Sequence, residues 1–270
     1  MSSRRAHQRK RFFVSERREK SLPCEGAIAS FGVMRIAVFL TVAFTVVAAK
    51  AGDFRPPARS SQAVLVLAPT WSSTTATLQR WSRHPGQFRW FREGELVPVV
   101  IGERGLGWGL GWHASPEDDG PRKIEGDRRA PAGVFRITGA FGESARGVGR
   151  MPWQRITPTL EAIDDAKSRF YNRIVDRARI AHPDWRSSER MAQIPAYALG
   201  LVVAHNPENI PGAGSCIFIH LSLGQRSGTA GCTALRESDL DTLVRWLDPK
   251  REPVLIQLPQ AIAARRLDGF

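Results

Sequence analysis

Residues 214–235 read Gly214-Ser-Cys-Ile-Phe-Ile-His-Leu-Ser-Leu-Gly-Gln-Arg-Ser-Gly-Thr-Ala-Gly-Cys-Thr-Ala-Leu235, and this pattern decides the local fold. The apolar run Cys216–Leu221 predicts a buried strand that carries His220 near its end. A loop of small residues follows, and Cys232 closes it before a predicted helix. Twelve positions separate His220 from Cys232, which is enough chain for a strand end to turn back. We therefore expect the two side chains to meet at one edge of a sheet.

A cysteine and a histidine held together would supply nucleophilic chemistry. A free thiol has a pKa of about 8.5 and is mostly protonated at neutral pH, so it needs a base or a positive field to attack. His220 would supply the base, and the loop of Thr229, Ala230 and Gly231 has backbone N–H groups that can face a developing oxyanion. Spacing alone leaves a second interpretation open, in which Cys232 and His220 are unrelated buried residues.

The remaining pattern predicts more strands than helices. The clearest helix is Glu237–Leu247, where apolar residues recur at helical spacing before Pro249 ends the run. Residues 160–182 contain helix-compatible pieces, and the glycine-rich residues 105–112 indicate a loop. We expect a mainly β domain, a β-rich α+β fold with a few peripheral helices. Its further strands are predicted at Ala63–Ala68, Phe88–Phe91, Leu96–Ile101, Gly133–Phe141, Leu199–Ala204 and Pro253–Leu258, with Glu93-Gly94 as the turn of a hairpin.

An uncharged apolar run at residues 36–49 predicts a signal peptide. Arg35 precedes the run, and Ala49-Lys50-Ala51 fits the small-x-small cleavage rule with the cut after Ala51. The run is shorter than the roughly 20 apolar residues of a spanning helix, although an uncleaved anchor stays the alternative. We interpret Met34 as the true start. The expected organisation is a basic extension at 1–33, a signal peptide at 34–51, a linker at 52–62, one domain at 63–258 and a tail at 259–270.

The net charge of +13 is unevenly distributed along the chain. Residues 1–33 carry eight Lys or Arg against three Asp or Glu, and Arg35 and Lys50 add two further positive charges. From Gly52 onward the balance is +6, with no dense basic run. This moderate charge favours an anionic polymer or membrane surface, and we expect no nucleic-acid partner.

Three cysteines are present, at positions 24, 216 and 232. The chain has no CxxC pair, and its His residues lack zinc-ligand spacing, so we expect neither a metal nor a cofactor. Cys216 is interpreted as a buried, inert thiol. The alternative is a disulfide with Cys232, which an oxidising compartment would permit.

The motifs around Cys232 resemble the active site of the L,D-transpeptidase catalytic domain (YkuD-like) family. That site has a His on a strand and then Ser-x-Gly-Cys, which His220 and Ser227–Cys232 match, in the branch with Thr-Ala-Gly-Cys-Thr-Ala. The resemblance covers roughly residues 63–258. Further similar segments are Lys123-Ile-Glu-Gly-Asp127, Pro131-Ala-Gly-Val-Phe135, Ser168-Arg-Phe-Tyr-Asn172, His205-Asn206, Cys216–His220 and Trp246-Leu-Asp-Pro249.

This resemblance implies a β-sandwich or barrel and attack on an amide bond of peptidoglycan stem peptides. It makes Cys232 the nucleophile, His220 the general base, and the Gly231 and Cys232 N–H groups the oxyanion donors. The thioacyl-enzyme forms as a D-amino acid leaves, and an amine then takes the acyl group. The expected location is the periplasm or cell envelope. We expect a monomer whose partners are stem peptides, with membrane contact only if the signal segment stays uncleaved.

The chain departs from the family pattern at two positions beside the cysteine. Ala230 stands where many members have His, and Ala234 where many have Arg or Asn. Recognition of a substrate carboxylate is therefore expected to move to Arg226 or Arg236. His205 and Asn206 either contact substrate or orient His220, or they form a hydrogen-bonded loop pair at a strand end.

Two other functions stay open at this level. A hydrolase would follow the same acyl-enzyme route, acting as an L,D-carboxypeptidase, an endopeptidase or an amidase. A non-catalytic peptidoglycan-binding domain would retain only the scaffold, and the intact pair of Cys232 and His220 argues against it.

The signal-peptide interpretation predicts a mature protein that begins at Gly52. Mass spectrometry of the protein purified from its native envelope measures this N-terminus directly. A chain that still begins at Met1 or Met34 would contradict the prediction.

Overall fold

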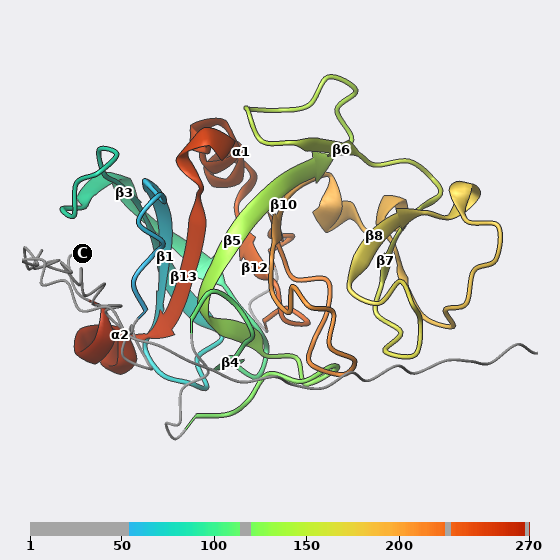
Figure 1. Ribbon diagram of the computed structural model, residues 1–270, viewed down its shortest axis with the longest axis horizontal. Helices are drawn as coiled ribbons and strands as arrows, with labels where there is room; N and C mark the ends of the chain where they lie inside the picture. The colour runs from blue at the N-terminus through green and yellow to red at the C-terminus, as the bar shows by residue number, and fades with distance from the viewer. Residues whose placement is uncertain (1–53, 114–119, 225–227, 268–269) are drawn as a thin grey trace, which may run out of the picture. The chain divides into compact units, whose positions relative to one another are not determined.

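The computed structural model describes residues 54–113, 120–224, 228–267 and 270. The basic extension, the predicted signal peptide and its cleavage site lie outside the described residues. Most described strands form one sheet, in the order β10, β11, β12, β3, β2, β1, β13, β5 and β4. Because β5 also pairs with β10, this sheet closes into a barrel (Figure 1). The mainly β fold predicted from the sequence is confirmed.

The barrel strands are β1 (Gln62–Ala68), β2 (Thr75–Ser82), β3 (Phe91–Val100), β4 (Leu106–Trp108), β5 (Ala130–Gly142), β6 (Trp153–Arg155), β10 (Leu199–Val203), β11 (Phe218–Leu221), β12 (Thr233–Leu235) and β13 (Val254–Pro259). Two α-helices are described, α1 (Glu237–Trp246) and α2 (Gln260–Arg266). Short 3-10 turns are η1 (Arg177–Arg179), η2 (Met191–Gln193), η3 (Pro195–Tyr197) and η4 (Pro249–Arg251). The predicted strands at β1, β5, β10 and β13 and the predicted helix at α1 are confirmed.

The predicted hairpin at Glu93-Gly94 is wrong. Strand β3 runs through these two residues, and the turn instead lies between β2 and β3, at residues 83–90. Pairing of β2 with β3 shifts register between Leu78 and Arg80. The Gln79 side-chain amide donates to the Glu93 and Gly94 carbonyls at this bulge. Gly94 adopts a φ of +71°, so the glycine that suggested a turn serves a β-bulge instead.

Residues 160–182, whose pattern is compatible with helical pieces, form strands and turns instead. The segment contributes β7 (Leu160–Ile163) and β8 (Arg173–Asp176), which join β9 (Glu189–Arg190) in a three-stranded antiparallel sheet. Its one helical element is the short turn η1. In Figure 1 this second sheet lies at the opposite end of the molecule from α2. Its residues build a separate apolar cluster against the outside of the barrel.

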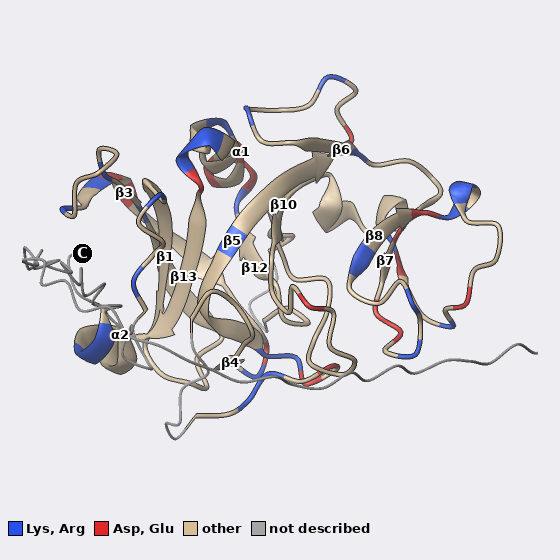
Figure 2. Ribbon diagram, in the orientation of Figure 1, with Lys and Arg blue, Asp and Glu red and all other residues tan. Residues whose placement is uncertain are grey.

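The barrel strands alternate between two hydrophobic clusters. Ile219 of β11 points into the barrel core, whereas Phe218 belongs to the outer cluster beneath the second sheet. Gly200 of β10 leaves room for the Phe141 ring there, because a Cβ at Gly200 would lie 2.3 Å from that ring. Figure 2 shows that Lys, Arg, Asp and Glu gather on loops, helices and the second sheet, whereas the barrel strands are largely uncharged.

Both ends of the described chain pack onto the barrel. Phe54, in the expected linker, is fully buried and stacks on Trp108. Arg83 holds the same segment by donating to the Ser60 and Pro57 carbonyls. At the other end, Phe270 stacks on Trp90. Within the described residues, no helix combines the length and apolarity required to cross a membrane.

A buried series of hydrogen bonds runs from Thr233, next to Cys232, through Gln257 to strand β5. The Thr233 hydroxyl donates to Gln257 Oε1 at 2.8 Å, and Gln257 Nε2 donates to the Pro131 carbonyl at 2.9 Å. Replacing Gln257 with Leu would leave both buried partners unsatisfied, so we expect a loss of about 1–3 kcal/mol or more in the free energy of unfolding. Urea denaturation measures it. The exposed Gln154→Leu control should change stability by less than about 0.5 kcal/mol, and an equal effect in both variants would contradict the prediction.

Candidate active site

His220 and Cys232 are brought together by parallel pairing of β11 with β12. His220 lies opposite Ala234, and Ile219 opposite Thr233, so Cys232 immediately precedes the paired segment. Both side chains are buried, with His220 6% and Cys232 8% exposed. The structure therefore places His220 on β11 and Cys232 directly before the adjacent strand β12.

The loop before Cys232 is shaped by close backbone contacts. Gly228 has a φ of +101°, and a Cβ there would lie 2.2 Å from the Cα of Glu103. Gly231 has a φ of +142° and abuts the Arg129 carbonyl. Thr229 pairs with Gly102 through a backbone bridge and donates its hydroxyl to the Cys232 carbonyl at 2.6 Å. These contacts explain why small residues precede the cysteine.

The Cys232 thiol is held against the backbone of the chain leading into β11. Its Sγ accepts the Phe218 N–H at 3.3 Å and lies 3.8 Å from the Cys216 carbonyl oxygen. Burial, together with the Glu189 carboxylate, raises the pKa of this thiol to about 12, and the Phe218 N–H opposes the shift only in part. The thiol is therefore protonated at neutral pH.

His220 is neutral and oriented by its own strand. Its Nδ1 lies 2.9 Å from the Leu221 carbonyl oxygen. Because a carbonyl oxygen only accepts, Nδ1 carries the hydrogen and Nε2 keeps a free lone pair. Burial lowers the pKa of the imidazole, and the bond to Leu221 partly offsets this shift. The ring is therefore prepared to accept a proton at Nε2.

In this structure the thiol and the imidazole are not hydrogen-bonded to each other. Within the described chain, Sγ contacts the Phe218 and Cys216 backbone, and the ring contacts Leu221. Attack therefore requires the thiol to turn from the strand backbone toward Nε2. Catalytic hydrogen bonds commonly tighten only when substrate binds.

Tyr197, which sequence reasoning missed, covers the pair. Its ring meets the His220 ring edge-on at a centroid distance of 5.5 Å and the Phe218 ring at 5.4 Å. Its hydroxyl donates to Glu189 Oε2 at 2.6 Å, and burial, more than the nearby negative groups, strongly raises the pKa of the phenol. Burial also raises the pKa of Glu189. No spacing signal relates residues 189 and 197 to Cys232, since Glu189 lies in β9 of the second sheet and Tyr197 in the turn η3.

The oxyanion loop differs in detail from its expected form. The Gly231 N–H, one of the two expected donors, points at the Thr229 hydroxyl at 3.1 Å. The same hydroxyl donates to the Cys232 carbonyl, so Thr229 links both ends of the turn. Ala230 is exposed and adds no side-chain group. An oxyanion role for Gly231 would therefore require its N–H to exchange partners.

His205 and Asn206 form the hydrogen-bonded loop pair that the sequence left open. His205 Nδ1 accepts the Leu110 N–H, and Nε2 donates to the Ala213 carbonyl. Burial lowers the pKa of His205 to about 4, which keeps the ring neutral. The Asn206 amide closes its own loop on Ile210 and Gly214. Both side chains are occupied by backbone partners, and neither is hydrogen-bonded to His220.

Two residues of the family-like segment Ser168–Asn172 act in the same way. Asn172 donates to the His205 and Asn206 carbonyls and accepts the Cys216 N–H. Tyr171 donates to Glu125 Oε2 at 2.5 Å and accepts the Gly214 N–H. These residues therefore tie the second sheet to the loop that enters β11.

Cys216 does not share the strand geometry expected for it. Strand β11 begins only at Phe218, and Cys216 adopts a left-handed φ of +52°, so strand alternation does not place its side chain. Its Sγ lies 3.4 Å from the Ile163 carbonyl, and both Cys216 and Cys232 are free thiols. Within the described residues, no cluster of His, Cys, Asp or Glu has the grouping of a metal site.

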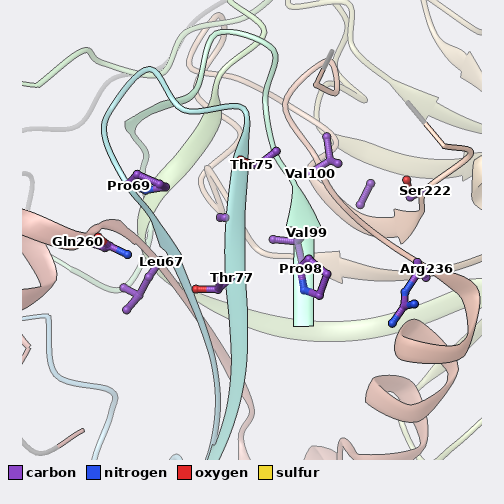
Figure 3. Close-up of a pocket in the computed structure, with 12 residues that line it drawn as sticks. Leu67, Pro69, Thr75, Thr77, Pro98, Val99, Val100, Ser222, Arg236 and Gln260 are labelled. Atoms are coloured by element: carbon purple, nitrogen blue, oxygen red, sulfur yellow. The ribbon is translucent and has the colours of Figure 1, made fainter. Parts of the chain in front are cut away.

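Two cavities are lined by neighbours of the pair, although neither lining includes His220 or Cys232. One, of about 370 Å³, is lined by Ala234 and Arg236, which follow the cysteine along β12 (Figure 3). The other, of about 360 Å³, is lined by Cys216 and Phe218, whose backbones touch the thiol. Arg236 thus borders the first cavity, whereas Arg226 lies outside the described residues.

Comparison with known proteins gives one family and one solved structure. A family profile described as the L,D-transpeptidase catalytic domain matches residues 82–256. Proteins of curated function give no significant match. The chain is similar to the crystal structure of the helical cell shape determining protein Pgp2 from Campylobacter jejuni, at 16% identity and a TM-score of 0.35 over 74% of this chain. It spans 48% of that chain.

The raised pKa of the Cys232 thiol predicts that no thiolate forms across the neutral range. Ultraviolet thiolate absorbance of the folded protein, with Cys232→Ser as the reference, should show no step assignable to this residue between about pH 5 and about pH 9. The step should appear only near the pKa of about 12. A thiolate step at or below neutral pH would contradict the neutral pair and indicate a resting ion pair with His220.

Proposed function

Since the chain belongs to the L,D-transpeptidase catalytic domain family, we propose that it is a cell-envelope cysteine acyl transferase acting on peptidoglycan stem peptides. Family membership indicates an L,D-transpeptidase-type function related to peptidoglycan. The proposal adds the reaction, its residues and its place: Cys232 acylates, His220 moves the proton, and the protein works after export. The observation that carries it is the neutral His220, which keeps Nε2 free on the strand paired beside Cys232.

The proposed reaction has two balanced steps. Cys232 Sγ gives its proton to His220 Nε2 and attacks the carbonyl carbon of a stem-peptide amide. The carbon–nitrogen bond breaks, the imidazolium returns the proton to the leaving amine, and a thioester remains on Cys232. An incoming amine then gives a proton to His220 and forms the new amide, and Cys232 recovers a proton as its thiol leaves.

The neutral resting pair suits this general-base route. With a pKa of about 12, almost none of the Cys232 thiol is ionised at neutral pH, so its proton has to be transferred to His220 as the sulfur attacks. The Leu221 carbonyl holds the imidazole in the required tautomer and would stabilise the imidazolium that forms. The Cys232 N–H remains the proposed oxyanion donor, joined by Gly231 if its N–H leaves Thr229.

Transfer to an amine is favoured over hydrolysis by the enclosure of the thiol. Cys232 belongs to the same buried apolar cluster as Phe218 and Tyr197, and it is only 8% exposed to solvent. Excluding water protects a thioester until the acceptor arrives.

Incubation of the purified protein with defined muropeptides, followed by mass analysis of the products, tests the reaction. New cross-links or exchanged terminal residues support the acyl transferase. Shortened stems without exchange would show a hydrolase instead. Binding without any product would contradict catalysis altogether.

Variants of the pair should behave as one catalytic unit. Cys232→Ala should abolish turnover, and His220→Ala should lose about 10² to 10⁴ in rate, the usual contribution of a positioned base. The double variant should be hardly worse than Cys232→Ala, since groups acting in one step are non-additive. Turnover of muropeptides and circular dichroism together measure activity and folding.

The matched control is His84→Ala, because His84 is an exposed loop histidine. It should retain wild-type activity. A folded His220→Ala variant with near-normal rate would mean that another group is the base. Full activity in Cys232→Ala would contradict the proposed enzyme.

A further inference from the structure

The turn between β2 and β3 exposes two neighbouring aromatic side chains. Phe88 is 88% exposed, and Phe91, at the start of β3, is 43% exposed. Between them Trp90 is buried and stacks on Phe270, with the ring centroids 4.9 Å apart. The turn is therefore anchored from beneath while both Phe rings stay in solvent. Single exposed apolar residues are common on protein surfaces, but two at one turn indicate a binding surface when their surroundings favour a partner.

Arginines flank the two Phe side chains. The Arg89 guanidinium lies 5.3 Å from the centroid of the Phe91 ring, and that of Arg92 lies 5.3 Å from the Trp81 ring. Both arginines are exposed, and neither is ion-paired within the described residues. A guanidinium that lies against a ring keeps its N–H groups available for anions such as phosphate. The turn therefore presents positive charge and apolar surface together.

No acidic side chain interrupts this surface along the turn. From Arg80 to Arg92 the chain has four Arg and one His and neither Asp nor Glu. The next residue, Glu93, accepts the indole N–H of Trp246, the last residue of α1, at 2.6 Å. Glu95 follows farther along β3, away from the turn. The turn itself is thus basic.

Helix α2 extends the basic surface. Phe270 lies against Trp81 as well as Trp90, which places the end of the chain beside the hairpin. Arg265 and Arg266 end α2, shortly before Phe270. Figure 1 shows α2 and the hairpin at the end of the molecule opposite the second sheet, and Figure 2 shows basic residues on both.

A bilayer of anionic phospholipid matches this combination of groups. Its headgroup phosphates would bind the guanidinium groups, and the layer beneath them would bury the Phe rings, since aromatic side chains favour that depth. A hydrated anionic polymer would supply the charges but no apolar layer for Phe88. The described chain also begins at this end, because Arg266 lies over the Phe54 ring at 5.7 Å. The apolar run predicted to direct export, residues 36–49, is therefore joined to the same end.

We propose that the β2–β3 turn and α2 form a docking surface for an anionic phospholipid bilayer. Phe88 and Phe91 enter the interfacial layer, and Arg89 and Arg92 bind headgroup phosphates. This contact is separate from the signal segment, so it would hold the mature domain at a membrane after cleavage. It also goes beyond the proposed reaction, because none of these four residues belongs to the apolar cluster that contains Cys232.

Vesicle co-sedimentation of the mature protein, purified from its native envelope, tests the docking surface. The probes are vesicles of phosphatidylcholine alone and vesicles with an equal part of phosphatidylglycerol. The anionic vesicles should bind the protein at least about 10-fold more tightly, and added salt should weaken that binding. Phe88→Ser with Phe91→Ser should weaken it by about 10- to 100-fold through lost apolar burial. Arg89→Gln with Arg92→Gln should remove most of the preference for anionic vesicles.

The matched control is Ile124→Ser with Ile210→Ser, which replaces two side chains that are 56% and 48% exposed in other loops. It should change vesicle binding by about twofold or less. Equal losses in the control and the Phe variant, or equal binding to both kinds of vesicle, would overturn the proposal. Binding to soluble dextran sulfate without vesicle binding would also overturn it, as would a dimer in sedimentation velocity that the Phe variant abolishes.

Muropeptide turnover separates the docking surface from the proposed function. The Phe and Arg variants should turn over soluble stem peptides at the wild-type rate, and circular dichroism checks that each is folded. Vesicle binding by a protein without turnover would support the docking surface and contradict the proposed reaction. Turnover without vesicle binding would do the reverse.

Discussion

Two strands that follow each other in the chain can pair in parallel only when the connection between them runs back from the end of the first strand to the level of its start. In this protein the return from β11 to β12 includes Gly228 and Gly231, which adopt backbone conformations closed to most side chains. The pairing that results sets His220 beside Ala234 and places Cys232 at the mouth of β12. The relative position of nucleophile and base follows from this register.

A second constraint comes from the turn η3, which follows the second sheet along the chain. Its residue Tyr197 packs onto Phe218 and His220, and burial of the pair raises the pKa of the thiol and lowers that of the imidazole. The two pKa shifts have the same consequence, because each of them favours the uncharged form of its group. The site is consequently uncharged at rest, and its charges develop only during attack. Such a site depends on positioning. The Leu221 carbonyl orients the imidazole and the Phe218 N–H holds the thiol, and substrate binding has to bring the two groups into contact.

Local pattern was sufficient to locate the pair and the main strands, since an apolar run and a loop of small residues are short-range signals. It failed where long-range pairing decides the outcome. Gly94 suggested a turn but serves a bulge, because Gln79 on the neighbouring strand binds the backbone there. Residues 160–182 are polar enough for several structures, and their strands form only by pairing with one another. Tyr197 carried no signal, because its position over His220 depends on the turn η3 and on long-range contacts with Phe218 and His220.

The central claim is that Cys232 becomes acylated, and trapping that thioester tests it most directly. Protein mixed with a stem-peptide substrate and quenched in acid should gain the mass of the acyl part without its leaving amino acid. Peptide mapping should place the added mass on Cys232 rather than Cys216. An adduct that forms equally well in Cys232→Ala, or no adduct under conditions where product accumulates, would contradict the account.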